Sequence, residues 1–167
     1  MRPISFSLLL IASLSGCETS TDPFTGIGGG GGGGGAVTQA QTTGNWSFTL
    51  RRTSTLPCTG GALATGQVIT AHIDVLSDGG VSPATSSWQS PANASVRPLS
   101  GSIRFSDGRT VLIFGSTGAS TTSGMELVGF VTASGAFTGT MTDPAPGLTP
   151  VFGTGGCEYA TTGTKTS

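Results

Sequence analysis

The chain has 167 residues, enough for one domain, and 29 of them are glycine. Charged residues make up only 9 % of the sequence, and the formal net charge is −1. The lack of a basic face argues against nucleic-acid binding, and the lack of an acidic run argues against a calcium cage or a charged tail. Helix formers are scarce, whereas Thr, Val, Ile and Phe recur between turn residues, which is typical of an all-β domain.

Residues 1–16 have the pattern of a secretory signal peptide. Arg2 supplies a positive charge, an apolar run extends from Ile4 to Leu14, and small residues follow it. The run is too short for a membrane-spanning helix, which needs about 20 apolar residues. A buried helix of the folded domain is disfavoured, because glycine-rich chain follows directly. We therefore expect export of the chain.

The four residues Leu14-Ser15-Gly16-Cys17 resemble the lipobox of bacterial lipoproteins. The resemblance implies diacylglyceryl transfer to the Cys17 thiol, cleavage before Cys17, and acylation of the new amino group by a fatty acid such as palmitate. Several acyl chains together anchor a protein stably, since each buried CH₂ contributes about 0.8 kcal/mol. Glu18 replaces the Asp that often signals inner-membrane retention. The resemblance thus implies a lipid anchor in the outer membrane, on its periplasmic face or at the cell surface.

Residues 17–43 lack any periodic pattern, and Gly28–Gly35 is an unbroken glycine run. Such a stretch buries no apolar surface and gains entropy by staying disordered. A phosphate-binding loop is the alternative for a glycine-rich run, but no Lys-Ser/Thr follows it and no helix pattern opens after it. We expect a lipidated cysteine followed by a disordered tether with a reach of roughly 25–30 Å.

Residues 44–167 consist of short alternating runs separated by turn residues, which predicts a β-domain. Asp107-Gly108 lies between two such runs and is the strongest short-range signal for a hairpin. Ser134-Gly135 joins a second pair of runs, and prolines blur a further strand near Ser86–Gln89. The predicted strands cover residues 45–50, 69–75, 102–106, 111–114, 125–132, 136–142 and 157–164.

Seven or eight antiparallel strands linked mostly by hairpins fit an up-and-down barrel, with a β-sandwich as the alternative. The meander order favours the barrel, because it lacks the long crossings of a Greek key. Glycines inside strands, at Gly115, Gly129 and Gly139, suit the bends of a small barrel. The inward positions are expected to be Trp46, Phe48, Leu50, Ile73, Phe105, Phe137 and Met141.

Cys58 and Cys157 remain once Cys17 is assigned to lipid, and a disulfide is the simplest expectation for such a pair in an exported domain. Cys58 follows the first predicted strand and Cys157 opens the last, so the bridge would join strands that are neighbours in a barrel. Closing a loop of about 100 residues stabilises a fold by up to ~4.7 kcal/mol. Two isolated cysteines and one histidine are not a metal-ligand set, so no metal or cofactor is expected.

Two short segments of the predicted domain resemble calycins, the family of small barrels that includes lipocalins. Gly44-Asn45-Trp46 is similar to the G-x-W at the start of lipocalins, and the stretch from Gly135 to Thr140 is similar to late-strand patterns of small ligand-binding barrels. The resemblance implies a compact barrel that binds a small apolar or amphipathic ligand. It carries no ligand-binding residue over to this chain.

His72 is the single histidine, and it lies two residues from Asp74, so both are expected on one strand face. Histidine beside a carboxylate can do acid–base chemistry, but this face is interpreted as polar and outward. No serine stands in a G-x-S-x-G elbow, and Glu126, Asp143 and Glu158 are too scattered for a carboxylate pair. No catalytic residue is assigned, and an enzyme is not expected.

Two noncatalytic roles remain open for the domain. The first is a membrane-anchored envelope lipoprotein whose β-domain is a structural or protein-interaction module. The second is a calycin-like binder of a small apolar or amphipathic ligand. A binding barrel leaves its interior unfilled, whereas a scaffold packs it solid. The bulky side chains at the predicted inward positions favour the first role, with the bilayer and an envelope protein as partners.

Overall fold

The computed structural model describes residues 34–54, 58, 63–91, 93–115, 122–152 and 156–167. Cys17, the predicted signal peptide and most of the predicted tether lie outside these residues. Within them the chain forms one short helix and nine strands. These elements are α1 (Gln39–Thr42), β1 (Gly44–Arg52), β2 (Val68–Ile73), β3 (Gly80–Val81), β4 (Ser87–Ser90), β5 (Asn93–Ile103), β6 (Arg109–Gly115), β7 (Gly124–Val131), β8 (Ala136–Asp143) and β9 (Cys157–Lys165).

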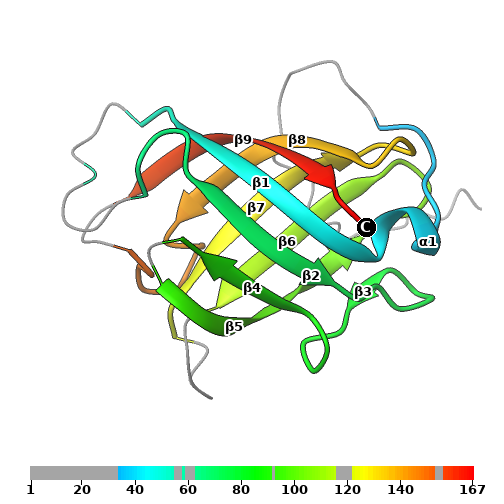
Figure 1. The fold of residues 1–167 in the computed structure, drawn as a ribbon, viewed down its shortest axis with the longest axis horizontal. Helices are drawn as coiled ribbons and strands as arrows, with labels where there is room; N and C mark the ends of the chain where they lie inside the picture. The colour runs from blue at the N-terminus through cyan, green and yellow to red at the C-terminus, as the bar shows by residue number, and fades with distance from the viewer. Residues whose placement is uncertain (1–33, 55–57, 59–62, 92, 116–121, 153–155) are drawn as a thin grey trace, which may run out of the picture. The chain divides into compact units, whose positions relative to one another are not determined.

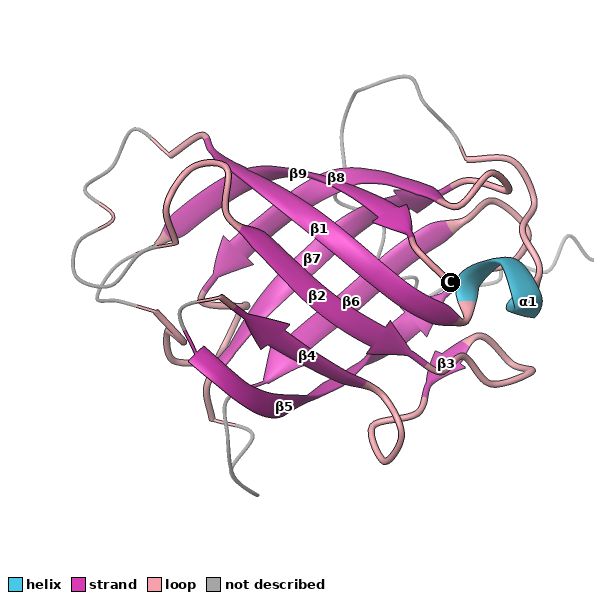
Figure 2. Ribbon diagram, in the orientation of Figure 1, coloured by secondary structure: helices cyan, strands magenta, loops and turns pink. Residues whose placement is uncertain are grey.

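All the described strands except β3 close into an antiparallel barrel (Figures 1 and 2). Its order is β1-β2-β4-β5-β6-β7-β8-β9, and β9 pairs again with β1. The short β3 pairs with the end of β5, where Gly80 lies opposite Ser102. Each barrel strand thus pairs with the next barrel strand in sequence. The predicted up-and-down barrel is confirmed, and the alternative sandwich is wrong because the β5–β6 and β1–β9 pairings close the sheet.

Both predicted hairpin turns are present, and each has a glycine in the left-handed region. Gly108 has φ +70° in the turn between β5 and β6, and Gly135 has φ +75° between β7 and β8. A side chain at either position would be strained whatever space is available. At Gly108 an added Cβ would also meet the carbonyl oxygen of Val131, whose N–H donates to the Gly108 carbonyl at 2.8 Å. Glycine is therefore required at this turn.

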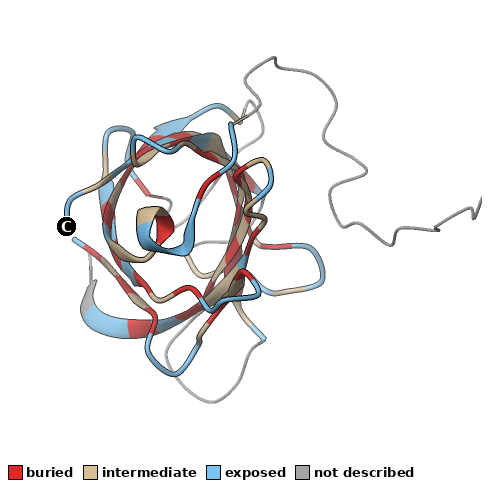
Figure 3. Cartoon of the chain, turned by 90° about the vertical axis from the view of Figure 1, so that its right-hand side faces the viewer, coloured by how far each residue is buried: buried red, intermediate tan, exposed pale blue. Residues whose placement is uncertain are grey.

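The folded domain starts before β1, and the predicted disorder of residues 17–43 is wrong from Val37 onward. Val37 is buried, and Thr38 caps α1 with a reciprocal capping box. The carbonyl of Thr42 accepts a hydrogen bond from Trp46 Nε1 at 2.9 Å, so the helix is held to the core. Figure 3 looks into this end of the barrel and shows α1 lying across the opening. We call it the α1 end.

The fifth strand differs from its prediction at both ends. It begins at Asn93, in a segment for which no strand was predicted, and it contains Pro98, which lies opposite Ser87 of β4. It ends at Ile103, so the predicted strand 102–106 is wrong for its last part. Those residues form the turn into β6, and the expected inward Phe105 is only partly buried.

The core of the barrel is a connected set of aromatic rings. Phe48 stacks against Trp46 with centroids 6.0 Å apart, and meets Phe114 edge-on at 6.0 Å and Phe137 edge-on at 5.6 Å. Trp88 joins the set through Phe114, at 5.6 Å. All the predicted inward residues except Phe105 are buried. Edge-on packing of this kind adds to the stabilisation from apolar burial.

Three strand glycines make room for these rings. A Cβ at Gly163 would lie 2.6 Å from Cδ1 of Phe48, and one at Gly129 would lie 2.6 Å from Cζ of Phe137. Gly139, the cross-strand partner of Gly129, is equally close to Phe137, at 2.7 Å. Gly129 and Gly139 were predicted to suit bends of the barrel. The structure adds a packing reason, since an aromatic ring covers the space where a side chain would be.

The predicted disulfide joins Cys58 to Cys157, with Cα atoms 5.1 Å apart. This separation lies within the range that disulfide geometry requires. Cys157 opens β9, which pairs with β1 along the barrel wall, so the bridge ties together the two terminal strands as predicted. The hydroxyl of Tyr159 lies 3.9 Å from Cys58 Sγ in the same buried region. We call this end of the barrel the disulfide end.

Candidate functional site

Six polar side chains form an ordered array on the outside of the barrel, over β1, β2 and β4. The strand register sets them in two rows of three, because alternate residues of each strand face outward. Asn45 lies opposite His72, which lies opposite Ser87 on its other side. In the second row, the order is Ser47, Thr70 and Gln89.

This array lines a groove of about 280 Å³, which we call the outer groove. Val96 of β5 and Thr166 near the chain terminus also line it. Val96 is 62 % exposed, the largest exposed fraction among the large hydrophobic residues in the described part of the chain. The outer groove therefore combines hydrogen-bonding groups with one exposed apolar side chain.

Hydrogen bonds hold Asn45 and His72 in place within the outer groove. His72 Nδ1 lies 3.0 Å from the amide oxygen of Asn45, within hydrogen-bond distance. Asn45 Nδ2 donates to Ser167 Oγ at 2.8 Å, and the backbone N–H of Thr166 donates to the Asn45 carbonyl at 2.8 Å. The chain terminus thus orders this part of the groove.

His72 and Asp74 have different partners and do not form an acid–base pair. Asp74 Oδ2 accepts a hydrogen bond from Thr85 at 2.5 Å, whereas His72 contacts Asn45. His72 lines the outer groove and Asp74 does not. The groove is lined by amide, hydroxyl and imidazole groups, and no carboxylate or cationic side chain belongs to its described lining. This lining offers hydrogen-bond donors and acceptors from amide, hydroxyl and imidazole groups.

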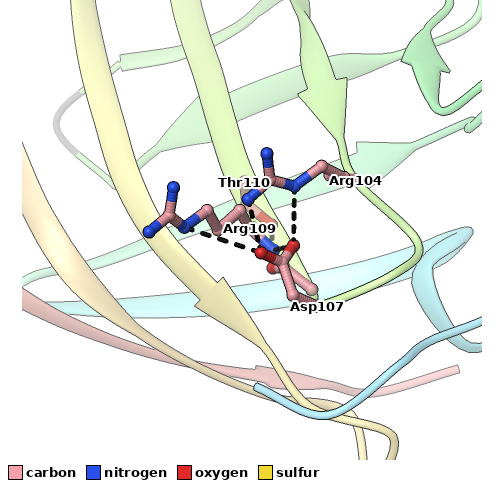
Figure 4. Close-up of polar contacts among 5 residues, drawn as sticks. Arg104, Asp107, Arg109 and Thr110 are labelled. Atoms are coloured by element: carbon pink, nitrogen blue, oxygen red, sulfur yellow. Dashed lines mark hydrogen bonds and ion pairs between the residues drawn. The ribbon is translucent and has the colours of Figure 1, made fainter. Parts of the chain in front are cut away.

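A charged cluster stabilises the turn between β5 and β6 (Figure 4). Asp107 accepts hydrogen bonds from Arg104 Nε at 3.0 Å and from the backbone N–H of Arg109 at 3.1 Å. Arg109 Nε lies 3.6 Å from the same carboxylate. The hydrogen bond from Arg104 holds the pKa of Asp107 below its usual value, more than partial burial raises it. The cluster explains why the chain turns here and ends the predicted strand 102–106 early.

A second cavity, of about 340 Å³, lies at the disulfide end beside Cys157 and is lined in part by Asp143 and Glu158. Asp143 is buried, and its two oxygens accept hydrogen bonds from the N–H groups of Val151 and Phe152 at 2.7 and 2.8 Å. Burial raises the pKa of Asp143, although these hydrogen bonds oppose the shift. The carboxylate serves to position the loop that carries Phe152.

The other candidate residues have structural positions. Trp46 and Trp88 are each 1 % exposed, and the indole N–H of Trp88 donates to the Gly115 carbonyl at 2.9 Å. Glu126 of β7 and Glu158 of β9 both lie opposite Thr142 of β8, which separates the two strands. Burial raises the pKa of Glu126. The register therefore places two carboxylates on one face that sequence distance alone had separated.

Three further observations bear on the class of protein. Among the described residues, no three His, Cys, Asp or Glu side chains gather as a metal site, and no helix is long and apolar enough to cross a membrane. No protein-family model, curated protein or solved structure matches the chain significantly. The fold and the groove define a small meander barrel with a disulfide at one end and a polar groove on its outer wall.

Sequence reasoning missed the outer groove. Each contributing strand shows its outward polar residues as an alternation, as in Asn45 and Ser47 or Thr70 and His72. Alternation gives the face of a residue but not its cross-strand neighbour, which depends on register. The groove also needs Val96, from a segment for which no strand was predicted. The sequence therefore indicated the polar face of each strand, but not which polar residues of different strands lie side by side.

Proposed function

We propose that the chain is a lipid-anchored envelope protein whose barrel acts without catalysis, as a structural or protein-interaction module. The barrel presents its outer groove to a partner, while the aromatic rings at its centre serve stability. Cys17 anchors the protein in the outer membrane through its acyl chains. The chain between Cys17 and Val37, with its glycine run, is the spacer between the anchor and the barrel.

The filled interior is the observation that carries this proposal. Rings of Phe48, Phe114 and Phe137 meet at centroid distances of 5.6 to 6.0 Å in the barrel centre. Gly163 lacks room even for a methyl group, because the ring of Phe48 occupies that space. A barrel that encloses an apolar ligand keeps such space open. Packing of this kind therefore favours a module that works through its outer surface.

The anchor is supported by the sequence alone. Leu14-Ser15-Gly16-Cys17 follows an apolar run of the length found in signal peptides, and it resembles a lipobox. The Cys58–Cys157 disulfide fits the same address, since such bonds persist in oxidising compartments outside the cytoplasm. Together these features support export followed by lipid attachment.

The chemistry of the outer groove indicates a protein partner. Its array of amide, hydroxyl and imidazole groups matches the donors and acceptors of a polypeptide backbone or of polar side chains. Val96 adds an exposed apolar contact at the edge. A surface of this composition resembles the polar, hydrogen-bonded part of transient protein interfaces.

Site-specific photocrosslinking in cells tests the proposal. A photoreactive amino acid replaces Thr70 in the outer groove, and the matched control replaces Thr138, an exposed threonine on β8. We expect a discrete adduct with an envelope component from position 70 and none from position 138. Ser47 is a second crosslinking position in the outer groove. Absence of an adduct from both position 47 and position 70 would contradict the proposal. A lipid or other apolar molecule retained by the purified protein in native mass spectrometry would favour the calycin-like binder instead.

A further inference from the structure

Arg97 is a buried arginine on the inner face of β5, opposite Trp88 of β4 in the strand register. Its exposed fraction is 9 %. Its Nε atom is buried without any hydrogen-bond partner, and no ion pair involves Arg97 within the described part of the chain. A buried polar atom without a partner is uncommon in folded proteins and calls for an explanation.

Two aromatic rings flank the guanidinium group. Its Cζ lies 5.0 Å from the ring centre of Trp88 and 5.5 Å from that of Phe152. The two rings are themselves edge-on, with centroids 6.1 Å apart. The hydroxyl of Ser90, a buried inward residue of β4 like Trp88, also has no hydrogen-bond partner. The charge, two rings and an unused hydroxyl thus lie on the inner wall near the disulfide end.

Cation–π contacts do not satisfy this group. A guanidinium carries five N–H donors, and contact with a ring face leaves donors in its plane without acceptors. A buried charge is costly unless it is both paired and hydrogen-bonded. Two acidic residues that could pair with Arg97 have other partners. Asp107 accepts a hydrogen bond from Arg104, and Asp143 accepts hydrogen bonds from two backbone N–H groups. The fold therefore buries the Nε–H donor of Arg97 and leaves it without an acceptor.

We propose that Arg97 is the recognition group of a binding site for a carboxylate at the disulfide end of the barrel. The planar fork of a guanidinium matches a carboxylate through two parallel hydrogen bonds. One arginine balances the single charge of a carboxylate, whereas a phosphate dianion calls for further donors or cations. The rings of Trp88 and Phe152 contact the apolar part of the ligand, and the Ser90 hydroxyl is a further donor.

Asp143 contributes to this site as a positioning residue. Its carboxylate fixes the backbone N–H groups of Val151 and Phe152, and the Phe152 ring packs against Arg97. The site takes a small group only, because Phe114 packs against Trp88 on the side of the filled core. The inference goes beyond the proposed function: the outer groove needs no occupant at Arg97, so either proposal can fail alone.

Titration of the purified protein with sodium benzoate tests the site, with benzamide as the neutral isostere and inorganic phosphate as the second anion. The Nε–H signal of Arg97 in a ¹⁵N–¹H spectrum reports directly on the unpartnered atom, and is assigned by its absence from the R97K variant. Tryptophan fluorescence gives the affinity of variants that lack this signal, because Trp88 adjoins Arg97. R51M removes an exposed arginine of β1 and is the matched control.

We expect a saturable shift of the Arg97 Nε–H signal with benzoate and none with benzamide. R97K, which keeps the charge and loses the fork, binds benzoate at least tenfold more weakly, R97M shows no saturable response, and R51M behaves as the unmodified protein. A missing or unsaturable shift, an equal response to benzamide, unchanged benzoate affinity in R97K, or tighter binding of phosphate than of benzoate each overturns the proposal.

Discussion

Replacing Gly163 with alanine tests the packing of the barrel interior. The new Cβ would lie 2.6 and 2.8 Å from Cδ1 and Cε1 of Phe48 and 3.2 Å from Cβ of Phe137. Neither neighbour can move away freely, since Phe48 also contacts Trp46 and Phe114. Overpacking of this kind costs typically about 1–3 kcal/mol. For a domain of this size, we expect the Tm to fall by roughly 4–12 °C.

Urea unfolding followed by tryptophan fluorescence measures the change in the free energy of unfolding. Gly156→Ala is the matched control, because nothing lies within 4 Å of an added Cβ at that position. Both substitutions reduce the entropy of the unfolded chain alike, so their difference isolates the packing cost. Equal stability of the two variants would show that the space beside Phe48 is open and would refute the filled interior.

A double substitution identifies Phe48 as the source of the cost. Phe48→Leu removes part of the ring that meets the new methyl group, so the loss in Gly163→Ala/Phe48→Leu is expected to be smaller than the sum of the single losses. Contacting residues typically show coupling of about 0.5 kcal/mol or more. Additive losses would place the strain of Gly163→Ala at another neighbour.

Three further predictions follow from the disulfide, two aspartates and the anchor. Replacing Cys58 and Cys157 with serine removes a cross-link spanning 99 residues, and is expected to lower the Tm by roughly 10 °C without changing the β signature in circular dichroism. Asp107 has a pKa below 3.8 in the folded protein, so it stabilises the fold above pH 3.8 and this stabilisation is lost on acidification. Asp143 has a pKa above 3.8 in the folded protein, so its contribution to the free energy of unfolding falls as the pH rises from 3.8 through that raised pKa. Asparagine variants should remove these opposite slopes from stability-against-pH curves. Radiolabelled palmitate should enter the unmodified chain but not Cys17→Ser, and equal labelling would contradict lipidation.

Local patterns predicted most of the barrel. The alternation of Trp46 and Phe48 with polar neighbours gave the first strand, and Asp107-Gly108 gave a hairpin, because both depend on neighbouring residues alone. The sequence also contains the capping box of α1, with Thr38 followed by Gln41. Because a glycine run precedes it, the whole segment was predicted to be part of the disordered tether. What holds α1 in place is the distant Trp46.

The two sites could not be predicted in the same way, because each depends on cross-strand register. Arg97 lies in a segment for which no strand was predicted, and its position opposite Trp88 follows only from the pairing of β4 with β5. Its second ring, Phe152, comes from a loop placed by the buried Asp143. Neither contact leaves a local signal.

The inward-facing and outward-facing side chains of the closed barrel have different roles. In a barrel this small, one set of alternating side chains has to fill the centre, and here Phe48 and Phe137 do so completely enough to require glycine opposite them. In both of our proposals, the partner or ligand therefore contacts residues outside the aromatic core. These lie on the outer wall, where His72 and its neighbours face solvent, and at the disulfide end, where Arg97 interrupts the apolar lining. A buried arginine whose Nε has no hydrogen-bond partner serves stability poorly, and a carboxylate ligand would supply the missing acceptor.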